Sequence, residues 1–236
     1  MKRLPTLIVL AGGLGTRLRS AVPDLPKILA PVNGVPYLTH FLRWCRAKGI
    51  VELHFCLGYK ADAVIRELKF WQHELNISWQ VEVELLGTGG AIKLALETLQ
   101  RQQEHDAFIV CNGDTFVDMP VSRFVSEAEK TGGALLTSWV SDAGRYGQVL
   151  TDEDNRLLRF QEKNEAGGAG YVNAGWYYLG AEHIANILSS SLVSFERDYL
   201  MFDDVPPITC LNMADTFLDY GTPESYRQAQ HYFGSN

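Results

Sequence analysis

Residues 7–19 read LIVLAGGLGTRLR and decide the fold. The apolar run at 7–11 predicts a short buried strand, because strands covered on both faces read as continuous apolar runs. Gly12, Gly13 and Gly15 follow at once, and glycines let the backbone turn sharply and expose its N–H groups to an anion. In open α/β sheets, ligands bind beyond the carboxyl ends of the strands. The loop after this strand is therefore a candidate phosphate site.

Two side chains near the loop strengthen this interpretation. Arg17 carries a planar, permanently charged guanidinium that suits phosphate oxygens. Lys27 follows ten residues later, between Pro26 and Pro31, which stiffen the segment and fix its direction. A plain tight turn is the alternative for the loop, and a solvated surface residue is the alternative for the lysine. Both cations beside one glycine-rich loop favour phosphate contacts.

Two familiar nucleotide loops do not fit. A dinucleotide fingerprint that begins at Gly13 needs glycine at its sixth position, where this chain has Leu18. A Walker A loop ends in Gly-Lys-Ser/Thr, which is absent here. A nicotinamide oxidoreductase is thus disfavoured.

Strand and helix patterns alternate through the first half of the chain. Strands are predicted at 7–11, 51–57, 77–85 and 107–111, and helices around 37–45, 61–71 and 92–99. This order predicts a Rossmann-like α/β fold, with a mostly parallel sheet and helices on both faces. Strands at 134–140, 147–150, 157–161 and 171–179 predict a smaller antiparallel or mixed portion, and Thr222-Pro223 begins a last helix. A single domain over residues 1–236 is the simplest organisation.

Composition excludes several classes of protein. The net charge of −7 makes a general nucleic-acid surface an unlikely function, while 46% hydrophobic residues are ordinary for a globular chain. No stretch is long enough for a membrane span, and the apolar run at 7–11 is too short for a signal peptide. The four cysteines form no CxxC pair, and three lie in apolar runs as buried thiols do. We expect a cytoplasmic protein without nucleic-acid or membrane partners.

A series of short motifs resembles the sugar-1-phosphate nucleotidyltransferase family. The motifs are Ala11-Gly12-Gly13-Leu14-Gly15-Thr16-Arg17 with Pro26-Lys27, Leu86-Gly87-Thr88-Gly89-Gly90, Asn112-Gly113-Asp114, Arg145-Tyr146-Gly147, Glu162-Lys163, Asn173-Ala174-Gly175 and Asp219-Tyr220-Gly221-Thr222-Pro223. Each motif is weak alone, but together they follow the family's order over nearly the whole chain. Within the family the chain is most similar to D-glycero-D-manno-heptose-1-phosphate guanylyltransferases, through residues 12–20 and Ala30-Pro31-Val32-Asn33.

The resemblance implies a nucleotide-diphospho-sugar transferase (GT-A-like) fold, with a nucleotide-binding half at 1–120 and a sugar-phosphate-binding half at 121–236. It implies that Arg17, Lys27 and Asp114 are catalytic and that Asp114 and Asp219 hold Mg²⁺, a cation that prefers oxygen ligands and phosphates. The implied nucleotide-binding residues are Ala11, Gly12, Gly13, Gly15, Thr16, Arg17, Lys27, Glu82, Gly87, Thr88, Asn112 and Gly113. The implied sugar-phosphate-binding residues are Gly147, Glu162, Lys163 and Asn173.

The implied reaction joins GTP and D-glycero-α-D-manno-heptose 1-phosphate to give GDP-heptose and pyrophosphate, for surface polysaccharide or S-layer glycan synthesis. Mannose-1-phosphate guanylyl transfer and uridylyl or thymidylyl transfer are alternatives within the class. A non-catalytic nucleotide-sugar-binding subunit is an alternative of a different class, although the chain retains Arg17 and both metal carboxylates. A homo-oligomer is compatible with all of these.

The base is suggested by two carboxylates. In Val81-Glu82-Val83-Glu84, alternation would place both glutamates on one face of a strand. A carboxylate only accepts hydrogen bonds, and guanine offers adjacent N–H donors on its Watson–Crick edge. Glu82 aligns with the family's base-reading position, which favours guanine, while a solvated charged face is the alternative. The sequence does not decide between Glu82 and Glu84 as the reader.

Overall fold

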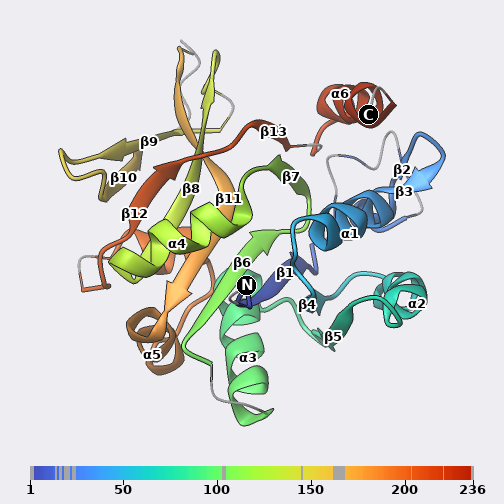
Figure 1. Cartoon of the computed structure of the whole chain (residues 1–236), viewed down its shortest axis with the longest axis horizontal. Helices are drawn as coiled ribbons and strands as arrows, with labels where there is room; N and C mark the ends of the chain where they lie inside the picture. Colours follow the sequence, from blue (N-terminus) through green and yellow to red (C-terminus); the bar gives the residue numbers. More distant parts are fainter. Residues whose placement is uncertain are drawn as a thin grey trace.

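The computed structural model describes residues 3–13, 15, 18, 22, 25–102, 105–144, 146–161, 168–202, 204–219 and 221–234. A seven-stranded sheet runs through the molecule in the order β12-β8-β11-β6-β1-β4-β5 (Figure 1). Its strands are β1 (Thr6–Ala11), β4 (Glu52–Leu57), β5 (Asn76–Val81), β6 (Ala107–Asn112), β8 (Gly133–Val140), β11 (Gly170–Gly180) and β12 (Thr209–Asn212). The helices are α1 (Tyr37–Ala47), α2 (Ala61–Trp71), α3 (Gly87–Gln102), α4 (Val121–Thr131), α5 (Ala181–Ser189) and α6 (Pro223–Gly234), with short helical turns η2 (Lys27–Leu29) and η3 (Glu196–Leu200).

The sheet is parallel on one side, from β6 to the edge strand β5, and mixed on the other. β1 pairs in parallel with both β4 and β6, and β4 pairs in parallel with β5. β11 is antiparallel to both of its neighbours, β6 and β8, and β12 is parallel to β8. The predicted α/β fold with a mostly parallel sheet is confirmed. The second-half strands β8 and β11 extend this same sheet, and a small separate hairpin is formed by β9 (Gln148–Thr151) and β10 (Leu157–Gln161).

Helices cover both faces because side chains of each central strand alternate between two cores. On β1, Leu7 and Val9 pack into a core with α1, α2 and α4. Ile8, between them, packs into the opposite core with α3 and α5. The four cysteines are buried in these cores, which confirms the prediction made for the three that lie in apolar runs. The longest of the described helices has 16 residues, and none meets the length and hydropathy required to cross a membrane.

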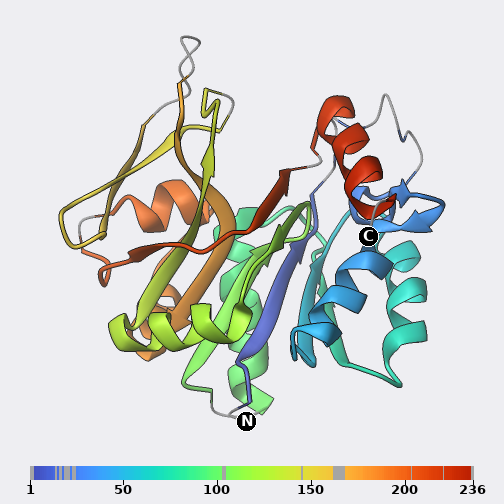
Figure 2. The ribbon, with the colours of Figure 1, turned by 45° about the horizontal axis from the view of Figure 1, so that its top comes forward.

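The C-terminal helix supports the segment that follows Lys27. β2 (Pro31–Val32) and β3 (Val35–Pro36) form a hairpin whose turn, Asn33-Gly34, has positive φ at both residues. The Gln230 side chain accepts a hydrogen bond from the Asn33 N–H at 2.7 Å and donates one to the Pro31 carbonyl at 2.7 Å. Tyr226 also donates to Pro31. Figure 2 shows α6 lying along this hairpin, beyond the end of β1.

Two boundaries differ from the sequence predictions. The strand predicted at 77–85 ends at Val81, and Val83 is 99% exposed, so the alternating pattern there does not continue the strand. Conversely, α3 begins at Gly87, five residues before the first apolar position of the predicted helix. Its first turn contains three glycines, which are poor helix formers, and packing against residues 192–195 supplies the missing stabilisation. The helices α4 and α5 were not predicted.

A buried histidine makes stability depend on pH. His183 on α5 is buried, and its Nδ1 lies 2.8 Å from the Tyr199 hydroxyl. Burial lowers the pKa of His183. As pH falls through about 6.5, the unfolded chain therefore binds a proton before the folded chain does. The stability that comes from keeping His183 neutral in the folded protein is fully present above about pH 6.5 and is lost progressively below it.

We expect the free energy of unfolding to fall between pH 7 and pH 5, and to fall less steeply in His183→Gln. One histidine changes the slope by at most about 1.4 kcal/mol per pH unit. Urea denaturation at closely spaced pH values measures both slopes, with pH 7.5 as the common reference. Equal slopes in the two proteins would show that His183 is protonated equally in both states.

Candidate active site at the carboxyl edge of the sheet

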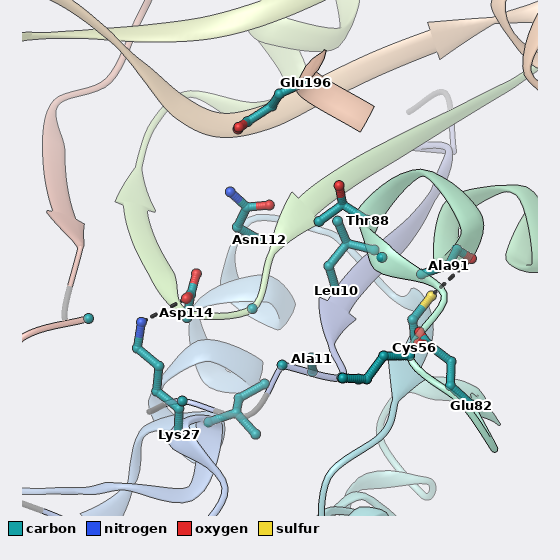
Figure 3. A pocket seen from close by; sticks show the side chains of 18 residues that line it. Leu10, Ala11, Lys27, Cys56, Glu82, Thr88, Ala91, Asn112, Asp114 and Glu196 are labelled. Carbon is teal, nitrogen blue, oxygen red and sulfur yellow. Dashed lines mark hydrogen bonds and ion pairs between the residues drawn. The ribbon is translucent and has the colours of Figure 1, made fainter. Parts of the chain in front are cut away.

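A cavity of about 600 Å³ opens at the carboxyl ends of the central parallel strands. Its lining comes from the ends of β1, β4 and β6, from the start of α3, and from segments between these elements and beyond them. Lining residues are Leu10, Ala11, Gly12, Gly13, Gly15, Lys27, Ile28, Cys56, Glu82, Leu85, Gly87, Thr88, Ala91, Asn112, Gly113, Asp114, Glu196 and Gly221. Figure 3 shows Lys27 and Asp114 at one end, Glu82 at the other, and Glu196 facing Asn112 across the space.

The predicted nucleotide-binding residues meet in this cavity. Every one that the structure describes is in its lining: Ala11, Gly12, Gly13, Gly15, Lys27, Glu82, Gly87, Thr88, Asn112 and Gly113. Thr16 and Arg17 lie outside the described residues. Gly15 brings the loop against Lys27, since a Cβ added at Gly15 would lie 3.2 Å from the Lys27 Cβ. The glycine loop and the lysine therefore line one site, as expected from their sequence order.

Lys27 lies between two carboxylates. Its Nζ is 2.7 Å from Asp114 Oδ2 and 3.9 Å from Asp219 Oδ1, and its side chain is only 10% exposed. One turn of η2 holds the lysine, with Ile28 and Leu29 buried beneath it. The electrostatic attraction between this ammonium and the two carboxylates is strong, because burial of the lysine weakens screening by water and salt.

Strand register brings the two aspartates together. Asp114 follows the end of β6, and β7 (Thr115–Asp118) begins at the next residue. β7 pairs antiparallel with β13 (Thr216–Asp219), and this register sets Asp219 opposite Thr115. Asp219 Oδ1 also accepts a hydrogen bond from the Gly221 N–H at 3.0 Å, which orients the carboxylate. Residues more than 100 positions apart are thus fixed at one point.

The two carboxylates suit Mg²⁺, which usually takes one or two protein carboxylates and completes its shell with phosphate oxygens and water. Within the described residues, no group of three or more His, Cys, Asp or Glu side chains forms a metal site of its own.

Glu82 occupies the opposite end of the cavity. Its N–H donates to the Leu57 carbonyl at 2.8 Å, and its Oε2 accepts from the Leu86 N–H at 3.2 Å. Burial raises the pKa of the Glu82 carboxyl, and the hydrogen bond from Leu86 partly opposes this shift. Glu84 is exposed and lies outside the cavity lining. The expectation that both glutamates share one strand face is wrong, because the strand ends at Val81 before either of them.

The predicted sugar-phosphate residues are less well grouped. Glu162 and Lys163 lie outside the described residues. Gly147 and Asn173 are not in the cavity lining. A Cβ on Gly147 would meet the Gln161 carbonyl at 2.8 Å, which places Gly147 at the β9–β10 hairpin. Asn173 instead donates to Glu196, which does line the cavity.

Sequence reasoning missed Glu196. It begins η3, within Ser194-Phe195-Glu196-Arg197-Asp198-Tyr199, where Phe195 and Tyr199 are spaced as on a helix. That pattern indicates a short helix with a buried face, but it carries no sign that the helix lies over the cavity. Only the tertiary contacts of η3 show its place.

The cavity is lined by glycines and lies at the carboxyl edge of the sheet, and a shielded lysine lies between two aspartates beside it. A glycine-lined cavity in this place is typical of α/β proteins that bind a nucleotide beyond their strand ends. Residues 6–235 match the family described as "Nucleotidyl transferase", and the chain belongs to that family. The family resemblance seen in the sequence motifs is thereby confirmed.

Three relatives show how far the similarity extends. The chain is 33% identical to a D-glycero-alpha-D-manno-heptose 1-phosphate guanylyltransferase of Campylobacter jejuni, over 93% of this chain and 96% of the relative. It is 32% identical to a protein of the same name from Aneurinibacillus thermoaerophilus, over 94% and 96%. The crystal structure of HddC from Yersinia pseudotuberculosis superposes with a TM-score of 0.85 at 33% identity, covering 98% of this chain and 100% of HddC. HddC has also been solved in complex with GMP-PN.

Gly87 offers a direct test of how the cavity edge is built. Its φ is +73°, and an added Cβ would lie 2.3 Å from the Val193 carbonyl oxygen. Gly34 has a similar φ of +76° but nothing within 4 Å of an added Cβ. Gly34→Ala should therefore cost only the left-handed backbone penalty, about 1–2 kcal/mol.

We expect Gly87→Ala to cost at least about 1–3 kcal/mol more than Gly34→Ala, because it adds a clash with backbone to the same penalty. Urea denaturation of the two variants and the parent protein measures the difference. Equal losses would mean that residues 192–195 do not pack closely on the start of α3.

Proposed function

We propose that this chain is a guanylyltransferase that converts GTP and D-glycero-α-D-manno-heptose 1-phosphate into GDP-heptose and pyrophosphate. The observation that carries the proposal is the pairing of Lys27 with Asp114 at one end of the cavity, opposite Glu82, with Asp219 beside the same ammonium. The named relatives, which align with this chain over nearly their whole length, support the choice of base and sugar.

In the proposed reaction, an oxygen of the sugar phosphate attacks the α-phosphorus of GTP in line. The bond from the α-phosphorus to the bridging oxygen breaks, and pyrophosphate leaves with that electron pair. Two anions must approach each other, and unit charges about 4 Å apart repel by roughly 4 kcal/mol at an effective dielectric of 20. The cations of the site would offset this repulsion.

Each charged residue has a distinct role in the proposal. Lys27 would contact the phosphates of GTP and stabilise charge that develops at the α-phosphate. Arg17 would bind the departing β- and γ-phosphates. Lys163 would bind the phosphate of the sugar, and Glu162 its hydroxyls. These assignments follow the motif resemblance, and Lys27 is supported by its place in the cavity lining.

Nucleotidyltransferases of this family generally use a divalent metal ion. We propose Mg²⁺, held by Asp114 and Asp219, whose carboxylates both face Lys27 Nζ. When bound, the metal would neutralise phosphate charge. The protein's own contribution is to fix the two carboxylates through the β7–β13 register and to keep Lys27 beside them.

Residues 1–120 would then bind the nucleotide and residues 121–236 the sugar phosphate, within one domain. A cytoplasmic site of action is part of the proposal, and a homo-oligomer is compatible with it.

The activity itself is tested by pyrophosphate release from the purified chain across a grid of nucleotides and sugar phosphates. The grid crosses GTP, ATP, UTP and dTTP with heptose, mannose and glucose 1-phosphates, in the presence of Mg²⁺. GTP with heptose 1-phosphate should give the largest kcat/KM. Absence of release with every pair would exclude a nucleotidyltransferase, and a larger value with mannose 1-phosphate would reassign the sugar.

Removing the Asp114 charge should abolish turnover. We expect Asp114→Asn to lower kcat by at least about 100-fold, because it removes a carboxylate that both pairs with Lys27 and would hold the metal. The exposed Asp62→Asn on α2 is the matched control. Steady-state kinetics over a Mg²⁺ titration measure the effect, and near-normal kcat at ordinary Mg²⁺ would remove Asp114 from the site.

Glu82 is expected to select the base. Glu82→Gln replaces one acceptor oxygen by a donor amide, so it should reduce the preference for GTP over ATP by about tenfold, the size of one hydrogen bond to a charged group. Glu84→Gln is the control, since Glu84 is exposed and outside the cavity. Competition assays with both nucleotides measure the ratio. Equal effects of the two substitutions would show that neither position contacts the base directly.

A further inference from the structure

Asn173 is fully engaged by the protein itself. Its Nδ2 donates to the Tyr177 hydroxyl at 2.8 Å and to Glu196 Oε1 at 3.0 Å. Its Oδ1 accepts from the Gly175 N–H at 2.8 Å. A primary amide has two N–H donors, so both are committed within the protein. Asn173 therefore has little capacity left for a ligand, although the family motif suggests that it binds one.

The Asn173-Ala174-Gly175 motif forms a bulge that shapes the cavity. The pairing of β11 with β8 shifts between Asn173 and Tyr177, so the strand bends at this point. Gly175 has φ of +73°, and an added Cβ would lie 2.6 Å from Asn112 Nδ2. The bulge thus holds one cavity residue, Glu196, through Asn173, and makes room for another, Asn112, through Gly175.

Glu196 is also held from the nucleotide side. The Phe195 N–H donates to Thr88 Oγ1 at 2.8 Å, and the Gly89 N–H donates to the Val193 carbonyl at 2.9 Å. A Cβ on Gly89 would lie 2.7 Å from the Leu192 Cβ, so the glycine allows this close approach. The segment before Glu196 is therefore anchored on the first turn of α3. Contacts from both halves of the chain fix one carboxylate over the cavity.

The charge of Glu196 limits what it can recognise. A carboxylate accepts hydrogen bonds and repels phosphate, so it should face uncharged hydroxyls. Its Oε1 takes the hydrogen bonds from Asn173 and, at 3.3 Å, from the Tyr177 hydroxyl, which leaves Oε2 for a ligand. Figure 3 shows Glu196 across the cavity from Asn112, apart from Lys27 and Asp114.

We propose that Glu196 accepts hydrogen bonds from hydroxyl groups of the sugar phosphate, and that Asn173 is a positioning residue that acts through Glu196. The proposal rests on the sugar-phosphate transferase function argued above. It assigns the phosphates to the Lys27 end of the cavity and the sugar hydroxyls to the Glu196 side.

A double-mutant cycle tests the two roles separately. Glu196→Ala should raise the sugar-phosphate KM about tenfold or more, as expected for loss of a hydrogen bond to a charged group, and should change the GTP KM less than twofold. Asn173→Ala should raise the same KM by a similar or smaller factor. The double variant should be no worse than Glu196→Ala, because residues that act as a unit are not additive. Glu182→Ala, an exposed glutamate on α5, is the control.

Multiplicative effects of the two substitutions would show that Asn173 contacts the ligand independently. An unchanged sugar-phosphate KM in Glu196→Ala, or an equal rise in the GTP KM, would overturn the role of Glu196. If Asn173→Ala does not fold, Tyr177→Phe weakens the same hydrogen-bond network with a smaller change in volume and takes its place in the cycle.

Hydrogen exchange separates this proposal from the proposed function. In Glu196→Ala, the Gly175 amide should exchange faster than in the parent protein, since Asn173 loses one of its anchors. An unchanged Gly175 rate would refute the positioning network whatever the enzyme's substrate. The parent protein could release no pyrophosphate with any sugar phosphate while Glu196→Ala still shows faster exchange at Gly175. That result would preserve the network. It would refute the proposed function and the hydroxyl contact that rests on it.

Discussion

The ammonium of Lys27 between the carboxylates of Asp114 and Asp219 constrains the rest of the cleft. Two carboxylates lie within 4 Å of the ammonium nitrogen, and the three charged groups come from segments far apart in the chain. The prolines around η2, the end of β6 and the β7–β13 pairing each deliver one of them. Paired carboxylates repel each other unless a cation lies between them. In the protein without ligands, the ammonium of Lys27 supplies that cation.

The second constraint is geometric, and it concerns how the two halves of the chain meet. The glycine turn that begins α3 contacts residues 192–195, and the bulge in β11 contacts both Asn112 and Glu196. At Gly87, Gly89 and Gly175 the approach is so close that an added Cβ would clash. The cavity is therefore shaped by backbone packing across the two halves as well as by the side chains that line it.

Much of the parallel sheet and of the nucleotide side could be predicted from the sequence. Continuous apolar runs mark the strands, the glycines after the first strand and the nearby Lys27 mark one edge of the sheet, and the motif resemblance adds Asp114. Gly12, Lys27 and Asp114 all line the same cavity. Glu82 was found, but through an alternating pattern that does not form a strand. Glu196 was missed because its significance comes from tertiary contacts with Asn173 and the start of α3. Local sequence patterns predicted the strands and helices of the first half of the sheet, although not α4 or α5. They contain little information about such long-range contacts.

The attachment of α6 to the β2–β3 hairpin bears on the order in which the protein acquires its active form. Ribosomes release the glycine loop and Lys27 long before α6, and the hairpin beside them receives the hydrogen bonds of Gln230 and Tyr226 only after that helix has emerged. Contacts nearly 200 residues apart in sequence form slowly, because a large loop must close first. A nascent chain can therefore build its central sheet while the lysine segment still lacks the support of α6, which ties maturation of the cleft to the synthesis of that helix.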